Sequence, residues 1–234
     1  MLVVPSLVAG YDFDGNPNDF SGNGLDATVY NANIFDGGPF GRYYNLNNTD
    51  HSYIDLGWSR TGDIGLFCDE TETWSVGMWF KVAYNAGGSI ICKGASVVAN
   101  RVFQIHFEGY TSRTYAPFFV IRGNLVGTAL ELDDDQWHHI MVTWDYSIAK
   151  LYIDGAYYDN IPVGTAADDL LQNVLIGGID NGTYQWQAWN GNVASVVFFN
   201  CALNQSDVSR VMMNTHPIAD DKNTFISTWK TWYI

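Results

Sequence analysis

The segment WHHIMVTWDYSIAKLYIDG, residues 137–155, decides the fold of this 234-residue chain. Apolar residues occupy alternate positions in both of its arms, which is the two-residue period of a β-strand with one buried face. They are Ile140, Val142 and Trp144 in the first arm, and Leu151 and Ile153 in the second. Residues 145–147 separate the arms as a turn, and Asp154-Gly155 predicts a second tight turn because glycine accepts positive φ without steric cost. The segment therefore predicts a complete antiparallel hairpin.

Short alternating runs of the same kind recur between turn-rich stretches along the chain. They cover residues 7–13, 74–82 and 103–107, and residues 193–199 are apolar almost throughout, as in a strand buried on both faces. One helix is expected after Asn204, which has the position of an N-cap, with Val208, Val211 and Met212 on one side. Many short strands with one helix indicate an all-β fold, an antiparallel two-sheet β-sandwich or jelly roll.

Seven segments follow one another in an order that resembles the laminin G-like, concanavalin A-like lectin family. The resemblance implies a β-sandwich that mainly binds glycans or partner proteins. No low-complexity linker or internal repeat divides the chain, so a single domain is expected over residues 1–216. The segments are YDFDGNPNDFSGNGLDATV (11–29), YYNLNNTDHSYIDLG (43–57), TWSVGMWFKV (73–82), SIICKG (89–94), the central hairpin, LIGG (175–178) and WNGNVASVVFFNCAL (189–203).

Charge and composition exclude several classes of partner. The chain has 11 Lys and Arg against 25 Asp and Glu, a net charge of −14, which disfavours nucleic acid and anionic membranes. No apolar run approaches the roughly 20 residues of a membrane-spanning helix, and the N-terminus lacks the basic region of a signal peptide. Three widely spaced cysteines, Cys68, Cys92 and Cys201, predict neither a disulfide framework nor a cysteine metal site.

A group of oxygen-bearing side chains near the N-terminus is a candidate calcium site. Its members are Asp14, Asn16, Asp19, Asn23 and Asp26. Calcium prefers hard oxygen ligands of this kind, but Pro17 stands where an EF-hand loop needs glycine. Relatives with a structural calcium often carry acids after the NG turn, where this chain has Ala194 and Ser195. The alternative is that these residues only build turns, for which Asp and Asn are suited.

Two aromatic loops are candidate glycan sites, since rings stack on sugar faces while amides and acids take the hydroxyls. In the first, Tyr184 and Trp186 alternate on one strand face beside Gln187 and Asp180, whereas Trp189 matches a position that relatives bury. The second has Tyr110 and Tyr115 near a hairpin tip. The alternative is that the rings cover the edges of the sandwich.

Catalysis is not expected. Laminarinase-like relatives use an E-x-D-x-x-E run, and the nearest approach here, residues 131–136, ends in Gln136, which cannot act as a general acid. A solvated acidic turn is the ordinary interpretation of that run. His138 and His139 are neighbours on a strand, so they face opposite sides and cannot bind one metal together.

Residues 217–234 form a separate tail that ends with Trp229, Trp232 and Tyr233. These rings are candidates for docking on a second copy of the chain or on another protein, and the alternative is that the tail folds back on its own domain. A recognition fold without an export signal is consistent with a protein of a phage or viral virion surface. Two functions stay open there: adhesion to a surface polysaccharide, or a purely structural decoration or fibre without sugar binding.

Overall fold

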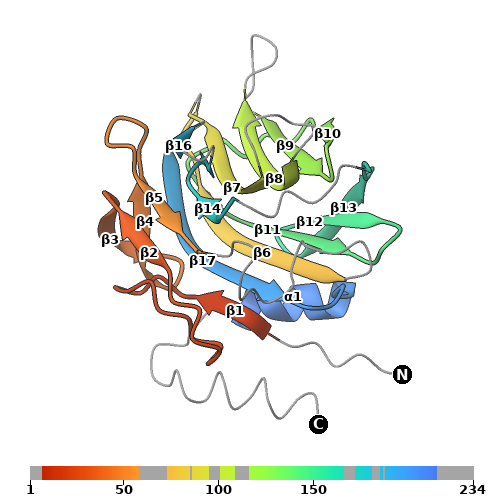
Figure 1. Ribbon diagram of the computed structural model, residues 1–234, viewed down its shortest axis with the longest axis horizontal. Helices are drawn as coiled ribbons and strands as arrows, with labels where there is room; N and C mark the ends of the chain where they lie inside the picture. The colour runs from red at the N-terminus through yellow and green to blue at the C-terminus, as the bar shows by residue number, and fades with distance from the viewer. Residues whose placement is uncertain are drawn as a thin grey trace.

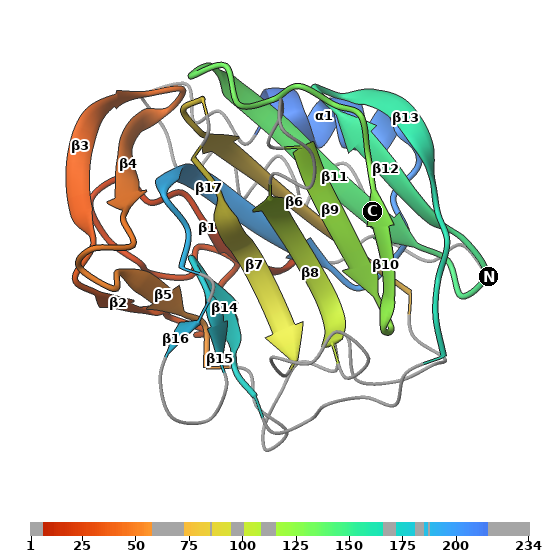
Figure 2. The same cartoon turned by 90° about the horizontal axis from the view of Figure 1, so that it is seen from above.

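Two antiparallel sheets are stacked face to face, and one helix lies against the outer side of the larger sheet (Figure 1). The computed structural model describes residues 7–57, 73–84, 86–94, 101–108, 116–165, 172–180, 185–186 and 188–214. Seen along the perpendicular direction, β7 (Gly88–Gly94) and β8 (Arg101–Glu108) of the smaller sheet lie in front of β6 (Trp74–Lys81) and β17 (Gly191–Phe199) of the larger one (Figure 2). The fold is the all-β two-sheet sandwich that the sequence predicts.

The larger sheet has eight strands in the order β13-β12-β11-β6-β17-β4-β3, with β1 paired to β17 beside this path. Its strands are β1 (Leu7–Tyr11), β3 (Asn33–Gly38), β4 (Gly41–Leu46), β6 (Trp74–Lys81), β11 (Trp137–Trp144), β12 (Ala149–Ile153), β13 (Ala156–Ile161) and β17 (Gly191–Phe199).

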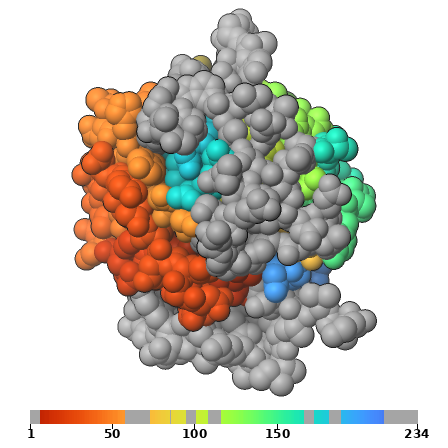
Figure 3. Space-filling view, in the orientation of Figure 1, coloured from red at the N-terminus to blue at the C-terminus, as the bar shows by residue number. Residues whose placement is uncertain are grey.

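The smaller sheet has seven strands in the order β10-β9-β8-β7-β14-β5-β2, and β15 pairs with β16 as a separate ribbon. These strands are β2 (Thr28–Tyr30), β5 (Tyr53–Asp55), β7 (Gly88–Gly94), β8 (Arg101–Glu108), β9 (Ala116–Ile121), β10 (Asn124–Gly127), β14 (Val174–Ile176), β15 (Ile179–Asp180) and β16 (Gln185–Trp186). On the face shown in Figure 3, residues 7–57 (red to orange) form one side and strands β9 to β13 (green) the other.

The predicted central hairpin is confirmed by the register of β11 and β12. Ile140 faces Ile153, and Val142 faces Leu151. The carboxylate of Asp145 closes the first turn by accepting hydrogen bonds from the backbone amides of residues 147 and 148, at 3.2 and 2.9 Å. The second turn has two left-handed residues, with φ of 49° at Asp154 and 78° at Gly155.

Strand β17 is buried on both faces because it serves two cores. Val193, Val196 and Phe198 face the main core between the sheets, whereas Val197 and Phe199 belong to a smaller core on the outer side. Helix α1 (Gln205–Asn214) closes this smaller core, in which its residues Val208 and Val211 join Met141 of β11. At 10 residues, α1 is too short to cross a bilayer, and the described part of the chain has no longer helix.

The predicted helix cap is also confirmed. Asn204 Oδ1 accepts hydrogen bonds from the backbone amides of Ser206 and Asp207, at 2.9 and 3.1 Å. Such a cap satisfies amides that have no partner within the helix. It fixes where α1 begins, and therefore which part of the outer sheet face the helix covers.

We predict that Phe198→Ala lowers the free energy of unfolding by about 3–5 kcal/mol, because it opens a cavity in the main core. Phe198 is fully buried there. Tyr146→Ala is the control: its side chain is 56% exposed at the turn before β12, so the change should stay within about 0.5 kcal/mol. Guanidinium denaturation of both variants measures the difference, and equal stability would contradict the proposed core.

Candidate functional site

A row of five side chains crosses the outer face of the larger sheet, on the same side as α1. We call it the amide row: Trp137, Lys81, Asn192, Asn45 and Asn33, which are successive register partners on β11, β6, β17, β4 and β3. Neighbouring strands lie about 4.8 Å apart, so the row spans about 19 Å. On β11, Ile140 points into the main core, so the alternate residues Trp137 and Met141 point to the outer face of the sheet. The amide row therefore lies on that outer face.

A second row, which we call the aromatic row, lies two residues further along the strands. It consists of Trp79 on β6, Tyr43 on β4 and Phe35 on β3. Tyr43 stacks on Phe35 with ring centroids 5.9 Å apart and meets Trp137 of the amide row edge-on at 5.3 Å. Phe40 packs edge-on against Trp79 at 5.3 Å. The two rows together, termed the outer strip, place rings beside amides on one sheet face.

The polar groups of the outer strip are arranged in two pairs. Asn45 Nδ2 donates a hydrogen bond of 2.7 Å to Asn192 Oδ1. Lys81 Nζ lies 3.2 Å from a carboxylate oxygen of Asp135. Within the described residues no hydrogen bond uses Asn45 Oδ1 or Asn192 Nδ2, so the amide pair presents one acceptor and one donor to an incoming group.

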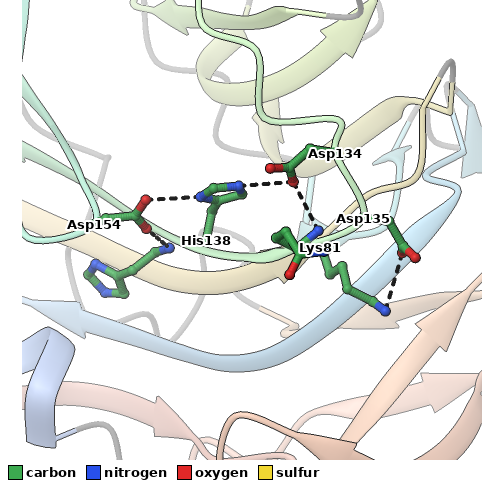
Figure 4. Close-up of polar contacts among 7 residues, drawn as sticks. Lys81, Asp134, Asp135, His138 and Asp154 are labelled. Carbon is green, nitrogen blue, oxygen red and sulfur yellow. Dashed lines mark hydrogen bonds and ion pairs between the residues drawn. The ribbon is translucent and has the colours of Figure 1, made fainter.

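The loop that carries Asp135 is held by a histidine clamp (Figure 4). His138 lies between two carboxylates, with Nδ1 2.9 Å from Asp154 Oδ2 and Nε2 3.1 Å from Asp134 Oδ1. Asp154 also accepts a hydrogen bond of 2.8 Å from the backbone amide of His139. The clamp thus ties the loop before β11 to the turn after β12, which keeps Asp135 beside Lys81.

The two adjacent histidines have opposite electrostatics. The hydrogen bond to Asp154 raises the pKa of His138 above its usual value of 6.5. Burial acts to raise the pKa of Asp154, but the hydrogen bonds from His138 and the His139 amide outweigh it and lower that pKa. Complete burial lowers the pKa of His139 to about 3, so its ring is uncharged where it packs against Trp79 at 5.4 Å. The ring of His138 therefore makes hydrogen bonds, whereas the ring of His139 packs, and neither of its nitrogens has a hydrogen-bond partner among the described residues.

The residues predicted to bind calcium fit a hydrogen-bonded turn better than a cation cage. The two oxygens of Asp19 accept from the amides of Gly10, Ser21 and Leu25 and from the Ser21 hydroxyl, at 2.7–3.1 Å. These bonds use the four lone-pair directions of a carboxylate. Asp26 accepts from the Asp19 amide at 2.8 Å, and Asn23 Nδ2 donates to Val8 O at 2.8 Å. Nowhere in the described ranges do three His, Cys, Asp or Glu side chains form a metal-like cluster.

Asn16 likewise closes a local turn, through a 2.9 Å bond from the Asn18 amide to its Oδ1. Asp14 lies next to the β3–β4 turn, where a Cβ on Gly41 would stand 3.1 Å from its carboxylate. Calcium binding by the five residues therefore stays a prediction, and nothing below depends on it.

The predicted loop sites lie mostly outside the described residues. Tyr110, Tyr115, Tyr184 and Gln187 are outside them, as are Cys68 and the tail residues Trp229, Trp232 and Tyr233. Trp186 is described in its backbone, which pairs with Ile179 in the β15–β16 ribbon. Asp180 accepts a hydrogen bond of 3.0 Å from the Asn173 amide just before β14, so at least one of its oxygens supports the fold. Glycan binding by these loops stays a prediction.

The acidic run before β11 is more structured than the expected solvated turn. Asp133 is buried, at 4% exposure, whereas Asp134 and Asp135 bind His138 and Lys81. The expectation is therefore wrong for Asp133. The sequence reasoning also missed the outer strip, although Trp79 and Trp137 occupy the positions that alternate with the core residues of two strands.

The histidine clamp predicts a loss of stability at alkaline pH. Folding raises the pKa of His138, so protonated His138 stabilises the folded chain. This stabilisation is complete below pH 6.5 and is lost as the pH rises through the pKa of His138 in the folded state. The lowered pKa values of His106 and His139, about 4 and 3, act only on the acid side. We expect urea denaturation to show a smaller loss from about pH 6 to about pH 9 in His138→Gln than in the native chain. The control is His51→Gln on the exposed surface, which should lose as much stability over this pH range as the native chain. If His138→Gln also lost as much stability as the native chain, the result would contradict a stabilising role of the clamp.

Comparison with solved structures identifies several with a similar fold. Domain 4 of a GH43 extracellular arabinanase from Geobacillus stearothermophilus, solved in complex with arabinotriose, superposes with a TM-score of 0.65 at 17% identity, covering 90% of this chain and 100% of that one. The binding domain of Paraclostridial Mosquitocidal Protein 1 gives 0.62 at 15% identity, with 88% and 52% covered. A structure titled for the interaction of botulinum neurotoxin type C with two ganglioside molecules gives 0.66 at 14%, with 90% and 52% covered.

The TM-scores show a shared fold, and the chain spans about half the length of the other two chains. No curated protein matches the chain in sequence. A family model described as the concanavalin A-like lectin/glucanases superfamily matches residues 48–209, which is more than half of the chain. The chain therefore belongs to the concanavalin A-like lectin/glucanase superfamily.

Proposed function

We propose that this protein is a non-catalytic glycan-recognition module that binds sugar with the outer strip. The observation that supports this most is the juxtaposition of the aromatic row with the amide row on one sheet face. Rings such as Tyr43 and Trp137 offer an apolar surface for the C–H face of a pyranose, while Asn45 and Asn192 offer hydrogen bonds to its hydroxyls.

The sheet also gives the site rigidity. The strip residues on β11, β6, β17 and β4 sit on strands whose alternate side chains are packed in the main core, such as Phe80 beside Lys81 and Val193 beside Asn192. Asn33 and Phe35 lie on β3, which is an exposed edge strand. A preformed surface loses little conformational entropy when it binds, which favours affinity for a small polar ligand. The arabinanase domain solved with arabinotriose shares this fold, as does the botulinum neurotoxin type C structure, which concerns its interaction with gangliosides. This supports sugar as the ligand class.

The absence of catalysis is part of the proposal, since the superfamily description names glucanases as well as lectins. A retaining glycosidase needs two carboxyl groups about 5 Å apart across the scissile bond. The acids nearest to the outer strip, Asp134 and Asp135, are engaged by His138 and Lys81. Gln136 follows them and has no acid function. These residues build and hold the strip in our proposal.

The remaining expectations on partners and setting are kept as secondary proposals. The rings of the two aromatic loops would extend a glycan site, and the tail rings at positions 229, 232 and 233 would dock on a second copy or on another protein. A virion-surface setting, whether as an adhesin or as a purely structural decoration, rests on the sequence alone. No contact among the described residues favours one of these settings over another.

We predict that Tyr43→Ala weakens binding to glycans on an array by about tenfold. It removes a ring that contacts both Phe35 and Trp137, and aromatic contacts of this kind contribute about 0.5–1.5 kcal/mol beyond area burial. Tyr146→Ala is the matched control, because the same residue type is exposed at the far end of β11. Binding that survives Tyr43→Ala but is lost in Trp186→Ala would move the site to the β15–β16 loop.

A further inference from the structure

We infer that the outer strip selects uncharged sugars, binding a neutral hexopyranose through a pair of adjacent hydroxyl groups; this rests on the proposed glycan-binding function. The inference follows from three features of the strip: its internally paired charges, the donor and acceptor that its amide pair leaves available, and the rings beside them. Each feature is set by the strand register that builds the two rows.

The strip offers no unpaired cation for an acidic sugar within the described residues. Lys81 is paired with Asp135 at 3.2 Å. Arg42, the neighbour of Tyr43 on β4, points to the opposite face of the sheet, where it lies 3.4 Å from Asp36. Asp135 is more exposed than Lys81, at 65% against 23% for the side chains. A sugar carboxylate approaching the strip would therefore meet negative charge first.

The whole molecule adds to this discrimination. Its net charge of −14 produces a negative field that lowers the local concentration of anions and their rate of association. This long-range effect is screened over about 10 Å at 0.1 M salt, whereas the paired charges at the surface act at short range. Selection against acidic sugars should thus have a salt-dependent part and a salt-independent part.

The amide pair can bind two adjacent hydroxyl groups of a sugar. With Asn45 Nδ2 bound to Asn192 Oδ1, the groups left for a ligand are the acceptor Asn45 Oδ1 and the donor Asn192 Nδ2. A hydroxyl group both donates and accepts, so two adjacent hydroxyls of one sugar can bind the two amides at the same time. Reversing both amides exchanges the two roles but keeps one donor and one acceptor.

The rings define how the sugar lies. Trp137 is at one end of the amide row, and Tyr43, which meets it edge-on at 5.3 Å, is next to Asn45 on the strip face. An apolar sugar face against these rings directs hydroxyl groups of the ring edge toward the amides. A neutral sugar satisfies both contacts without bringing a charge beside Asp135.

The test compares glycans that differ only in charge. The full chain is titrated by calorimetry with β-linked tetrasaccharides of glucose, mannose and galactose, and with the same tetrasaccharides oxidised at the primary hydroxyl to uronic acids. We expect at least tenfold tighter binding of the best neutral tetrasaccharide than of its oxidised form, and a smaller ratio at high salt. Asn192→Ala should weaken the neutral ligand by about three- to tenfold, the range expected for a hydrogen bond.

Asp135→Asn supplies the matched charge test. It leaves Lys81 without its partner, so the oxidised tetrasaccharide should gain affinity relative to the neutral one. Asp159→Asn makes the same charge change on the exposed edge strand β13 and should leave the ratio unchanged. Equal or tighter binding of the oxidised form by the native chain overturns the inference and leaves glycan recognition standing. If no tetrasaccharide of either kind binds, the proposed function fails, and this inference fails with it.

Discussion

Strand β17 lies in the middle of the larger sheet, and its register with β6 and β4 determines both the core and the outer strip. The partners Val193 with Phe80 and Phe198 with Val76 bring its apolar side chains into the space between the sheets. The register shifts by one residue between Val193 and Ser195, and on the Val193 side of this shift Asn192 lies opposite Lys81 and Asn45. Because side chains alternate between faces, a shift by one residue would bury the amides and expose the core. Burial of the large apolar residues of β17 therefore also determines which polar side chains lie in the outer strip.

Helix α1 divides the outer face of the larger sheet into two regions with different roles. Around Met141 and Val197, the helix covers the sheet and forms a second core. Toward the start of β11, about 13 Å from Met141, the amide row is half-buried or exposed. There the histidine clamp replaces the helix as the supporting structure, since His138 joins the loop of Asp134 to the Asp154 turn. Packing thus stabilises one region, and hydrogen bonds and ion pairs order the other.

Much of the fold was predictable because it depends on local periodicity. Alternating residues identified the inner faces of β6, β8 and β11, the Asp154-Gly155 turn followed from its residue types, and Asn204 marked the start of α1. The candidate site was not predictable in the same way. Asn45 and Asn192 are separated by 147 positions and meet only through strand register, which alternation within a strand does not specify. The Asp19 turn shows the converse difficulty, since the same oxygen donors suit a cation and a set of backbone amides.

The most direct test of the account is to map a bound neutral oligosaccharide onto the protein by NMR. Side-chain amide and indole N–H signals report separately on the two rows. Binding should shift the side-chain amides of Asn45 and Asn192 and the indole signal of Trp137, and it should leave the backbone of α1 unchanged. Shifts confined to residues 109–115 and 181–187, with the outer strip unaffected, would contradict the claim that the larger sheet carries the binding surface.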